Sequence, residues 1–244
     1  SLDQELTTLR AAVHQAPYPV WLQSEEGNVT WSNLAYDDLS QKIRGRNADF
    51  AQPLFTDLHD PMTSGKPDAT DILDFWWMAG PPRWFARSDA FDEEIRDRFG
   101  ALVAAAREGE LDGWAEAPHG ALALLLLLDQ FPRNIYRGDA LAFASDARAR
   151  AIAGKAVESR FDRAFPKQAR PFFYLPFEHA EEMAAQERSV DLFRRHGEQE
   201  AYLYALIHLD VIRRFGRFPH RNTVLGRVST EAEKAFLADG GFSA

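Results

Sequence analysis

Two short segments of this chain place an arginine and an asparagine directly after a Phe-Pro pair. Residues 130–134 read Gln-Phe-Pro-Arg-Asn, and residues 217–222 repeat the pattern as Arg-Phe-Pro-His-Arg-Asn, with one inserted histidine. A guanidinium donates two parallel hydrogen bonds to a carboxylate or phosphate, which makes such corners suitable for an anion. The candidate ligand-binding residues at the two corners are Arg133, Asn134, Arg137, Arg217, His220, Arg221 and Asn222.

The same corners have a structural interpretation. Each arginine can pair with a carboxylate of the protein, as Arg133 would with Asp129 one helical turn earlier. Arginines can also satisfy the free carbonyls at the end of a helix. In that case the two corners would lock the fold together without binding a ligand.

A second polar group begins at Glu178 and His179 and continues to Glu182 and Gln186. On a predicted helix over residues 178–195, the histidine, Glu182 and Gln186 share one stripe with apolar side chains. The apolar part of this stripe must face the core, so the polar part turns inward as well. Burying a polar group without a partner costs about 1–3 kcal/mol. The pattern therefore predicts a polar network, a ligand or a metal.

His208 lies on the apolar face of the next predicted helix. A short joint at Gly197 would make the two helices antiparallel neighbours and bring His208 close to His179 or Glu182. These three side chains could form a metal set, but no established ligand spacing is present and we predict no metal site. General acid–base catalysis by Glu178 and His179 is the preferred interpretation if the protein is an enzyme.

The composition is that of a globular protein and excludes several classes of function. The chain has 244 residues, 45% of them hydrophobic and 27% charged. Its formal charge of −9 argues against a nucleic-acid or anionic-membrane partner. The absence of cysteine excludes disulfides, thiolate metal sites and a cysteine nucleophile. The apolar run 121–128 is too short to span a bilayer and no signal pattern opens the chain, so we expect a cytoplasmic protein.

The elements that must position these residues are helices from residue 68 onward. The run 119–130 is apolar almost all round and is predicted to be the central buried helix, ended by Pro132. Thr230 and Glu233 have the spacing of a capping box at the start of the last helix. The other predicted helices cover residues 71–78, 89–108, 139–160, 167–174, 178–195 and 198–215. This succession predicts a mainly α fold, either a bundle or a solenoid of antiparallel helical hairpins.

The first 67 residues differ in character. They predict a short amphipathic helix, a β-hairpin within 19–31, a helix over 33–43 and a linker over 45–67. About the first 45 residues contain the motifs Ala16-Pro17, Pro19-Val20-Trp21-Leu22, Gly27-Asn28-Val29, Trp31-Ser32-Asn33 and Ala35-Tyr36. Through these motifs the segment resembles the opening of a PAS sensor domain. The further strands of a PAS sheet are missing, so ligand sensing by this segment is not expected.

The helical part of the chain, residues 68–242, contains six further motifs. They are Ile72-Leu73-Asp74-Phe75-Trp76, Arg83-Trp84-Phe85, the run from Leu128 to Gly138, the run from Tyr174 to His179, Gln186-Glu187-Arg188-Ser189, and the run from Arg214 to Asn222. Through these motifs it resembles the bacterial family known as domain of unknown function 924. Where members usually read Glu-His-Ser-Glu, this chain has Ala180 in place of the serine. The resemblance implies an all-α fold similar to tetratricopeptide-type helical hairpins and implies no reaction.

We therefore expect a partial PAS-like segment and linker over 1–67 and an all-α domain over 68–244. The leading hypothesis is a site between helices for a small anionic ligand, with the corner residues beside Glu178, His179, Glu182, Gln186 and His208. The alternative is a non-enzymatic, tetratricopeptide-like scaffold that binds a protein partner, in which these residues form a structural polar network. Nothing in the sequence identifies a cofactor or decides whether the protein is an enzyme.

Overall fold

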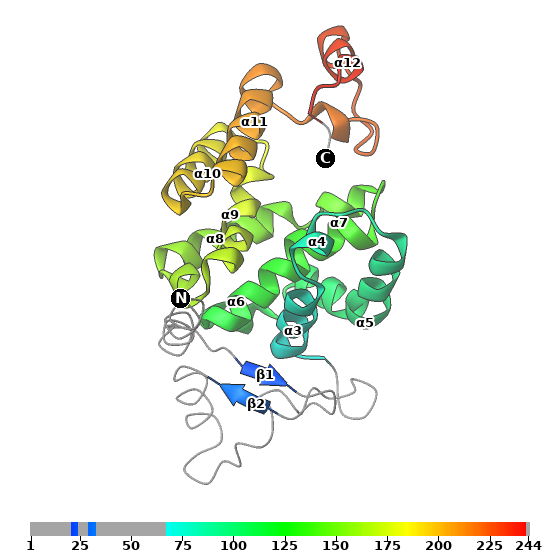
Figure 1. Ribbon diagram of the computed structural model, residues 1–244. Coiled ribbons are helices and arrows are strands. Elements are labelled where there is room, and N and C mark those ends of the chain that lie inside the picture. Colours follow the sequence, from blue (N-terminus) through cyan, green and yellow to red (C-terminus); the bar gives the residue numbers. More distant parts are fainter. Residues whose placement is uncertain (1–20, 24–28, 33–66, 243–244) are drawn as a thin grey trace, which may run out of the picture. The chain divides into compact units, whose positions relative to one another are not determined.

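The computed structural model describes residues 21–23, 29–32 and 67–242, and the chain divides into two units at residues 66 and 67 (Figure 1). In the first unit, strand β1 (Trp21–Gln23) pairs antiparallel with strand β2 (Val29–Ser32). Trp21 lies opposite Ser32, and the register is irregular after Leu22. The turn of the predicted hairpin, the two predicted helices, most of the PAS-like motifs and the linker up to residue 66 lie outside the described residues.

In the second unit every regular element of the described residues is a helix, as the sequence predicts. Helix α6 (Pro118–Leu125) contacts α3 (Ala69–Ala79), α8 (Asp146–Glu158) and α9 (Pro171–Glu178). No helix of the described ranges is both long and apolar enough to cross a membrane. The α-helices are α3 (Ala69–Ala79), α4 (Pro81–Trp84), α5 (Asp89–Glu108), α6 (Pro118–Leu125), α7 (Phe131–Ile135), α8 (Asp146–Glu158), α9 (Pro171–Glu178), α10 (Met183–His196), α11 (Gln199–Phe215) and α12 (Glu231–Ala238).

The core of this unit surrounds helix α6, whose residues 121–125 are buried together with the π turn after it. An aromatic cluster from α3, α4 and α5 packs against it. Trp76 stacks on Trp84 with ring centroids 6.1 Å apart, and the Trp84 indole donates a 2.6 Å hydrogen bond to the carbonyl of Trp76. These rings are packing residues, because both are almost fully buried.

The predicted stop at Pro132 is wrong, because the helical path continues through it. Helix α6 passes into a π turn (Leu126–Gln130) and then into α7, with Pro132 in its first turn. Proline has no N–H, so the carbonyl four residues earlier, that of Leu128, lacks its usual partner. The Ser145 hydroxyl donates to this carbonyl at 2.7 Å. The missing hydrogen bond is thus replaced by a side chain at the start of helix α8.

Two predicted long helices are broken. The helix predicted over 139–160 begins as a 3₁₀ turn (Ala140–Phe143), and α8 starts only after Ser145, whose hydroxyl is engaged with Leu128. The helix predicted over 178–195 is interrupted between α9 and α10. The Gln186 amide donates to the carbonyls of Glu178 and Ala180 at 2.6 and 2.7 Å, which holds the chain in a turn there. His179 and Gln186 therefore do not share one helical stripe.

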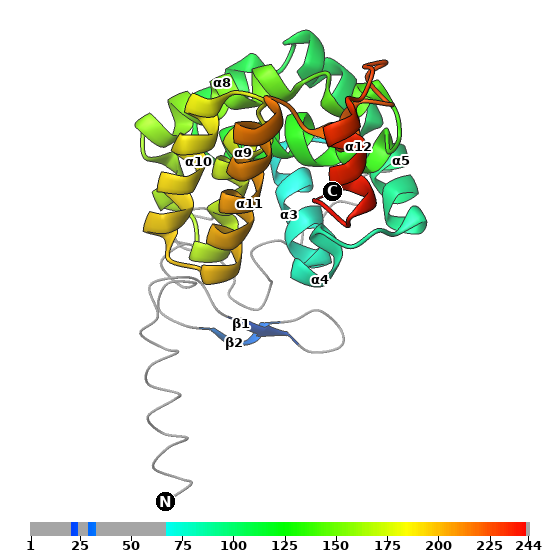
Figure 2. The ribbon, with the colours of Figure 1, turned by 90° about the horizontal axis from the view of Figure 1, so that it is seen from above.

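Helices α10 and α11 lie side by side (Figures 1 and 2), joined at Gly197, whose φ of +77° suits glycine. Helix α11 ends at Gly216 and leads into the second Phe-Pro corner, which forms a short 3₁₀ turn (Pro219–Arg221). The predicted capping box is present at the start of α12. The side chain of Thr230 accepts from the backbone N–H of Glu233, and the side chain of Glu233 accepts from the backbone N–H of Thr230. This hairpin and the corner after it form one wall of the site.

Candidate functional site

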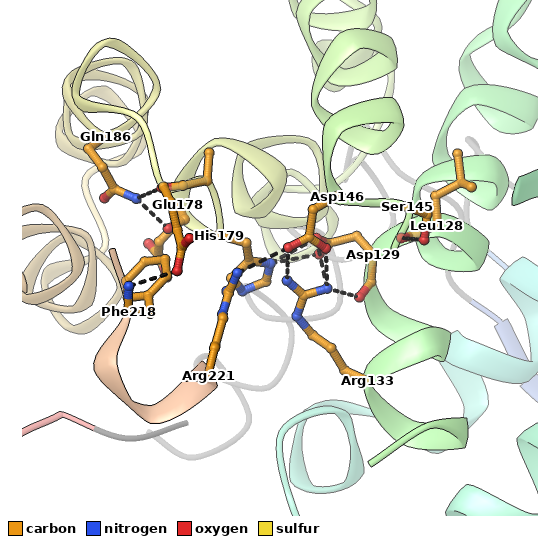
Figure 3. A network of polar contacts seen from close by, with 12 residues as sticks. Leu128, Asp129, Arg133, Ser145, Asp146, Glu178, His179, Gln186, Phe218 and Arg221 are labelled. Atoms are coloured by element: carbon orange, nitrogen blue, oxygen red, sulfur yellow. Dashed lines mark hydrogen bonds and ion pairs between the residues drawn. The ribbon is translucent and has the colours of Figure 1, made fainter. Parts of the chain in front are cut away.

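The two Phe-Pro corners meet at one carboxylate. Arg133, in the first turn of α7, donates two hydrogen bonds to Asp146 at 3.0 and 3.1 Å. Arg221, from the second corner, donates to the same carboxylate at 3.2 Å (Figure 3). Asp146 lies in the first turn of α8, where the helix dipole favours a negative charge. One carboxylate is therefore shared by two guanidinium groups.

The side chain of Arg221 is buried, with 6% of its surface exposed, and is held between two aromatic rings. Phe143 and Phe218 each lie with their ring centre 4.5 Å from the guanidinium carbon. Burial, followed by the positive charge of Arg133, lowers the pKa of Arg221 to about 10. Its Nε atom has no hydrogen-bond partner among the described residues. The surrounding protein thus compensates this cation incompletely.

A histidine–carboxylate pair lies beside the shared carboxylate (Figure 3). Nδ1 of His179 is 2.8 and 3.0 Å from the two oxygens of Asp129, which is 1% exposed. Burial alone would raise the pKa of Asp129, but Arg133 and His179 together hold it below its usual range. Burial, followed by the charge of Arg133, lowers the pKa of His179. At neutral pH the pair is therefore a carboxylate bound to a neutral imidazole.

Glu178 and His208 form a second buried pair. Oε1 of Glu178 is 3.4 Å from Nδ1 of His208, and that nitrogen donates a 2.8 Å hydrogen bond to the Tyr204 carbonyl. Burial and the nearby charge of Asp129 raise the pKa of Glu178 to about 8. Burial and neighbouring His179 lower the pKa of His208 to about 3. Both groups are thus neutral at pH 7.

A cavity of about 710 Å³ within the helical unit is lined by Arg133, Arg221, His179, Glu178 and His208, while Asp129 and Asp146 lie outside its lining. The size suits a small organic molecule. The apolar part of the lining includes Phe172, Leu175 and Phe193, while Phe85 is largely exposed. The polar part includes three histidines, Glu178 and the guanidinium groups of both corners. A ligand with an apolar body and a charged group would match this division.

The family of the chain is shown by comparison with known proteins. The family model described as bacterial protein of unknown function, DUF924, matches residues 72–241. The chain belongs to this family. A solved structure, that of the protein of unknown function ATU0120 from Agrobacterium tumefaciens, is 48% identical with a TM-score of 0.68. The match covers 70% of this chain and 97% of that one. No curated protein matches.

Most of the predicted site residues of this DUF924 chain come together in one place. Two of them, Asn134 and Arg137, reach the cavity beside a carboxylate of α5. Asp92 accepts 2.8 and 3.0 Å hydrogen bonds from Arg137 and one of 2.7 Å from Asn134. The predicted residues that line the cavity are Arg133, Asn134, Arg137, Glu178, His179, His208, His220 and Arg221.

Four predicted residues do not line this DUF924 cavity. Glu182 lies at the start of α10 and pairs with Arg150 at 2.7 Å. Gln186 is buried and holds the turn after α9. Arg217 pairs with Glu233 at 2.6 Å.

The fourth, Asn222, is buried and donates to the Ser229 hydroxyl at 3.0 Å. None of these four side chains is part of the cavity lining. The possible metal set of His179, Glu182 and His208 is not assembled by the fold. Among the residues that the structure describes, no group of three potential ligands is placed to hold a metal ion.

Three carboxylates that organise this DUF924 site are not among the site residues predicted from the sequence. Asp129 is expected there only as a partner for Arg133, to which it lies 3.4 Å away. For Asp146 and Asp92 the sequence predicts no role in the site. A signal is present for the first of the three, because Asp129 comes directly after the apolar run 121–128. An ionised side chain at the end of a buried run requires a partner.

Proposed function

We propose that the cavity of the helical unit binds a small organic acid. Its carboxylate would be held at Arg221 beside Arg133, and its carbon skeleton would lie against Phe172, Leu175 and Phe193. The supporting observation is the state of Arg221, a buried guanidinium at the cavity wall. It donates a single hydrogen bond to Asp146, whose two oxygens are already bound by Arg133. An anionic ligand would accept from the terminal guanidinium N–H groups that Asp146 leaves free.

The test is a thermal-shift screen at fixed protein concentration with acetate, succinate, 2-oxo acids, phosphate, sugar phosphates and nucleotides. A ligand at 100 times its dissociation constant stabilises the folded state by about 2.7 kcal/mol. For a chain of this size that corresponds to a rise in Tm of about 5–10 °C. We expect such a rise with a carboxylic acid.

Matched arginine variants localise the effect. Arg221→Met should abolish the shift, while Arg195→Met should retain it, because Arg195 is an exposed residue that does not line the cavity. A shift that survives in the Arg221 variant would place the anion elsewhere and refute the proposal. A shift with phosphate compounds alone would replace the carboxylate by a phosphate as the bound group.

The alternative function is a tetratricopeptide-like scaffold for a protein partner. It is favoured by the pairing of Arg133, Arg137 and Arg217 with carboxylates of the protein. In that case no small acid would shift Tm, and Arg221→Met would lower stability alone. Binding of a partner would then have to map to exposed apolar side chains such as Leu203 and Val228.

A further inference from the structure

The π turn places one carboxylate in an apolar interior with its hydrogen bonds directed at a histidine. Asp129 accepts from Nδ1 of His179 at 2.8 Å and from the Gln130 amide at 2.6 Å. Arg133 lies 3.4 Å away and keeps the carboxylate ionised. π turns within α-helices occur often at functional sites. The surroundings of Asp129 therefore fix both its charge and the direction of its partner.

This geometry determines which nitrogen of His179 carries the proton. An ionised carboxylate only accepts hydrogen bonds, so Nδ1 must be the N–H donor and Nε2 must hold the lone pair. Within the described residues Nε2 has no hydrogen-bond partner, and His179 lines the cavity. The imidazole is neutral at pH 7, because burial lowers its pKa. A basic nitrogen is thus available to a bound molecule.

The other groups around the cavity limit the chemistry available. The described lining contains no serine, threonine, cysteine or lysine, so no side chain of these types can attack a ligand as a nucleophile there. Proton transfer requires only a positioned base and a stabilised product anion. A C–H beside a ketone carbonyl is acidic enough for an imidazole base, whereas one beside a carboxylate alone is not.

We propose that His179, positioned by Asp129, is the general base of a proton-transfer reaction on a small 2-oxo acid bound in this cavity. This inference rests on the proposed function, since the carboxylate of the acid would be held at Arg221. The carboxylate and the adjacent carbonyl oxygen lie on one edge of such a molecule. That edge matches the parallel donors of a guanidinium.

The step is a balanced proton exchange. Nε2 of His179 takes a proton from the carbon next to the ketone, and the C–H electron pair becomes the enolate. The negative charge that develops on the enolate oxygen is stabilised by the guanidinium donors beside Asp146. Return of a proton from the imidazolium restores the acid. In D₂O the N–H of the imidazolium exchanges with solvent before the return step, so a deuteron is delivered to the carbon and the reaction is visible without a net chemical change.

The experiment uses the full chain with pyruvate, 2-oxobutyrate and 2-oxoglutarate in D₂O. Loss of the C3 proton signal is followed by NMR, and binding is measured in parallel by thermal shift. We expect exchange above the rate without protein for at least one acid that also raises Tm. His179→Asn should lower the rate by about 100-fold or more, the usual contribution of a general base. His119→Asn is the matched control, because His119 is exposed and outside the cavity.

Asp129→Asn tests the positioning role. It should retain the thermal shift, lower the exchange rate by about tenfold or more, and move the acidic limb of the pH profile to lower pH. The last effect is expected because the Asp129 charge raises the pKa of His179. A purely structural role for Asp129 would lower Tm without moving that limb.

The outcomes separate the two proposals. A thermal shift without exchange in the wild-type chain overturns the proton-transfer reaction and leaves the binding site standing. The absence of a shift with every acid overturns both. Exchange that persists in His179→Asn assigns the base to another residue and overturns the role of His179. Hydrolysis of a 4-nitrophenyl ester without any exchange would overturn the reaction on 2-oxo acids and show that the base activates water instead.

Discussion

The two Phe-Pro corners share a sequence pattern but differ in how completely their arginines are paired. In the first corner Arg133 bonds Asp146 through both oxygens and also donates to the Asp129 carbonyl at 2.7 Å. In the second, Arg221 reaches the same carboxylate with a single hydrogen bond at 3.2 Å. The difference indicates a division of roles, with a structural arginine in one corner and an arginine with unused donors in the other.

The burial of the preceding phenylalanine is the same in both corners. Phe131 and Phe218 are each fully inaccessible to solvent, and each fixes the start of its corner in the core. The difference lies in the next segment of the chain. After Arg133 the chain continues as helix α7, whereas after Arg221 it leaves the helical path towards α12. The repeated motif is therefore an anchoring device whose polar residues acquire different partners.

The largest expected effect comes from removing Asp146, the carboxylate that the two corners share. Asp146→Ala would leave two guanidinium groups close together without their common carboxylate. Removal of one partner from a buried ion pair costs about 3–5 kcal/mol, which urea denaturation would measure. Asp112→Ala is the control, because it removes an exposed pair with Arg148 and should cost less than about 1 kcal/mol. Equal losses would show that the shared carboxylate has no special importance.

A second prediction concerns Glu178, the buried carboxyl group in the wall of the same cavity. The pKa of Glu178 is raised to about 8 in the folded state, compared with an ordinary value of 4.5. A raised pKa favours the folded state below pH 4.5, and this contribution is lost as pH rises through 8. Glu178→Gln should therefore gain stability relative to the wild type between pH 4.5 and 8, by up to about 5 kcal/mol in total, as measured by urea denaturation across that range. A constant difference would show that Glu178 is ionised in the folded protein.

A third prediction separates the two arginines directly. Arg133→Met should lower stability by about 2–4 kcal/mol, because both Asp146 and Asp129 lose a partner. Arg221→Met should cost only about 1–2 kcal/mol, because Asp146 remains bound to Arg133 through both oxygens. The effect on ligand binding should be the reverse. Arg221→Met should lose the thermal shift caused by the acid, and Arg133→Met should be affected less. Equal stability losses would remove the division of roles.

The smallest expected effect concerns the N-cap of helix α12, which follows the second corner in the chain. Thr230 caps helix α12, and Glu233 joins this cap to Arg217. Thr230→Ala should cost about 1 kcal/mol of stability, the usual effect of removing an N-cap. Thr223→Ala, at an exposed position nearby, should change stability by less than about 0.5 kcal/mol. A loss well above 1 kcal/mol would mean that the cap also holds the second corner in place.

The helical class, the family and the central buried segment were predictable because each depends on patterns along the chain. The apolar run 121–128 identifies a buried helix by composition alone, and the capping box identifies the start of α12. The break between α9 and α10 was not predictable, because it depends on the Gln186 amide reaching back to two carbonyls. Local propensity does not contain such a tertiary contact.

The residues that form the site were partly predictable for a similar reason. Arg133 and Arg221 could be selected because the Phe-Pro motif occurs twice, and His179 because a polar residue in an apolar stripe stands out in a sequence. Their common partner could not, because Asp146 lies on a predicted helix among ordinary charged residues such as Arg148 and Arg150. The meeting of two distant corners at α8 is a property of the packing. Asp146 would have been included if each arginine predicted to face the core had been paired with every acidic residue in the first turn of a predicted helix.

The π turn also makes chain length at the end of the central helix a constraint of its own. Such a turn contains one more residue between hydrogen-bonded partners than an α-helical turn. Deleting one of the leucines 126–128 would replace this wide turn by an α-helical one, and the backbone dihedral angles around Asp129 would change. The Asp129 carboxylate would then no longer be directed at His179. Exchanges among the leucines here alter packing, whereas a one-residue change in length would alter the site itself, so homologous chains should vary here in residue type but not in number.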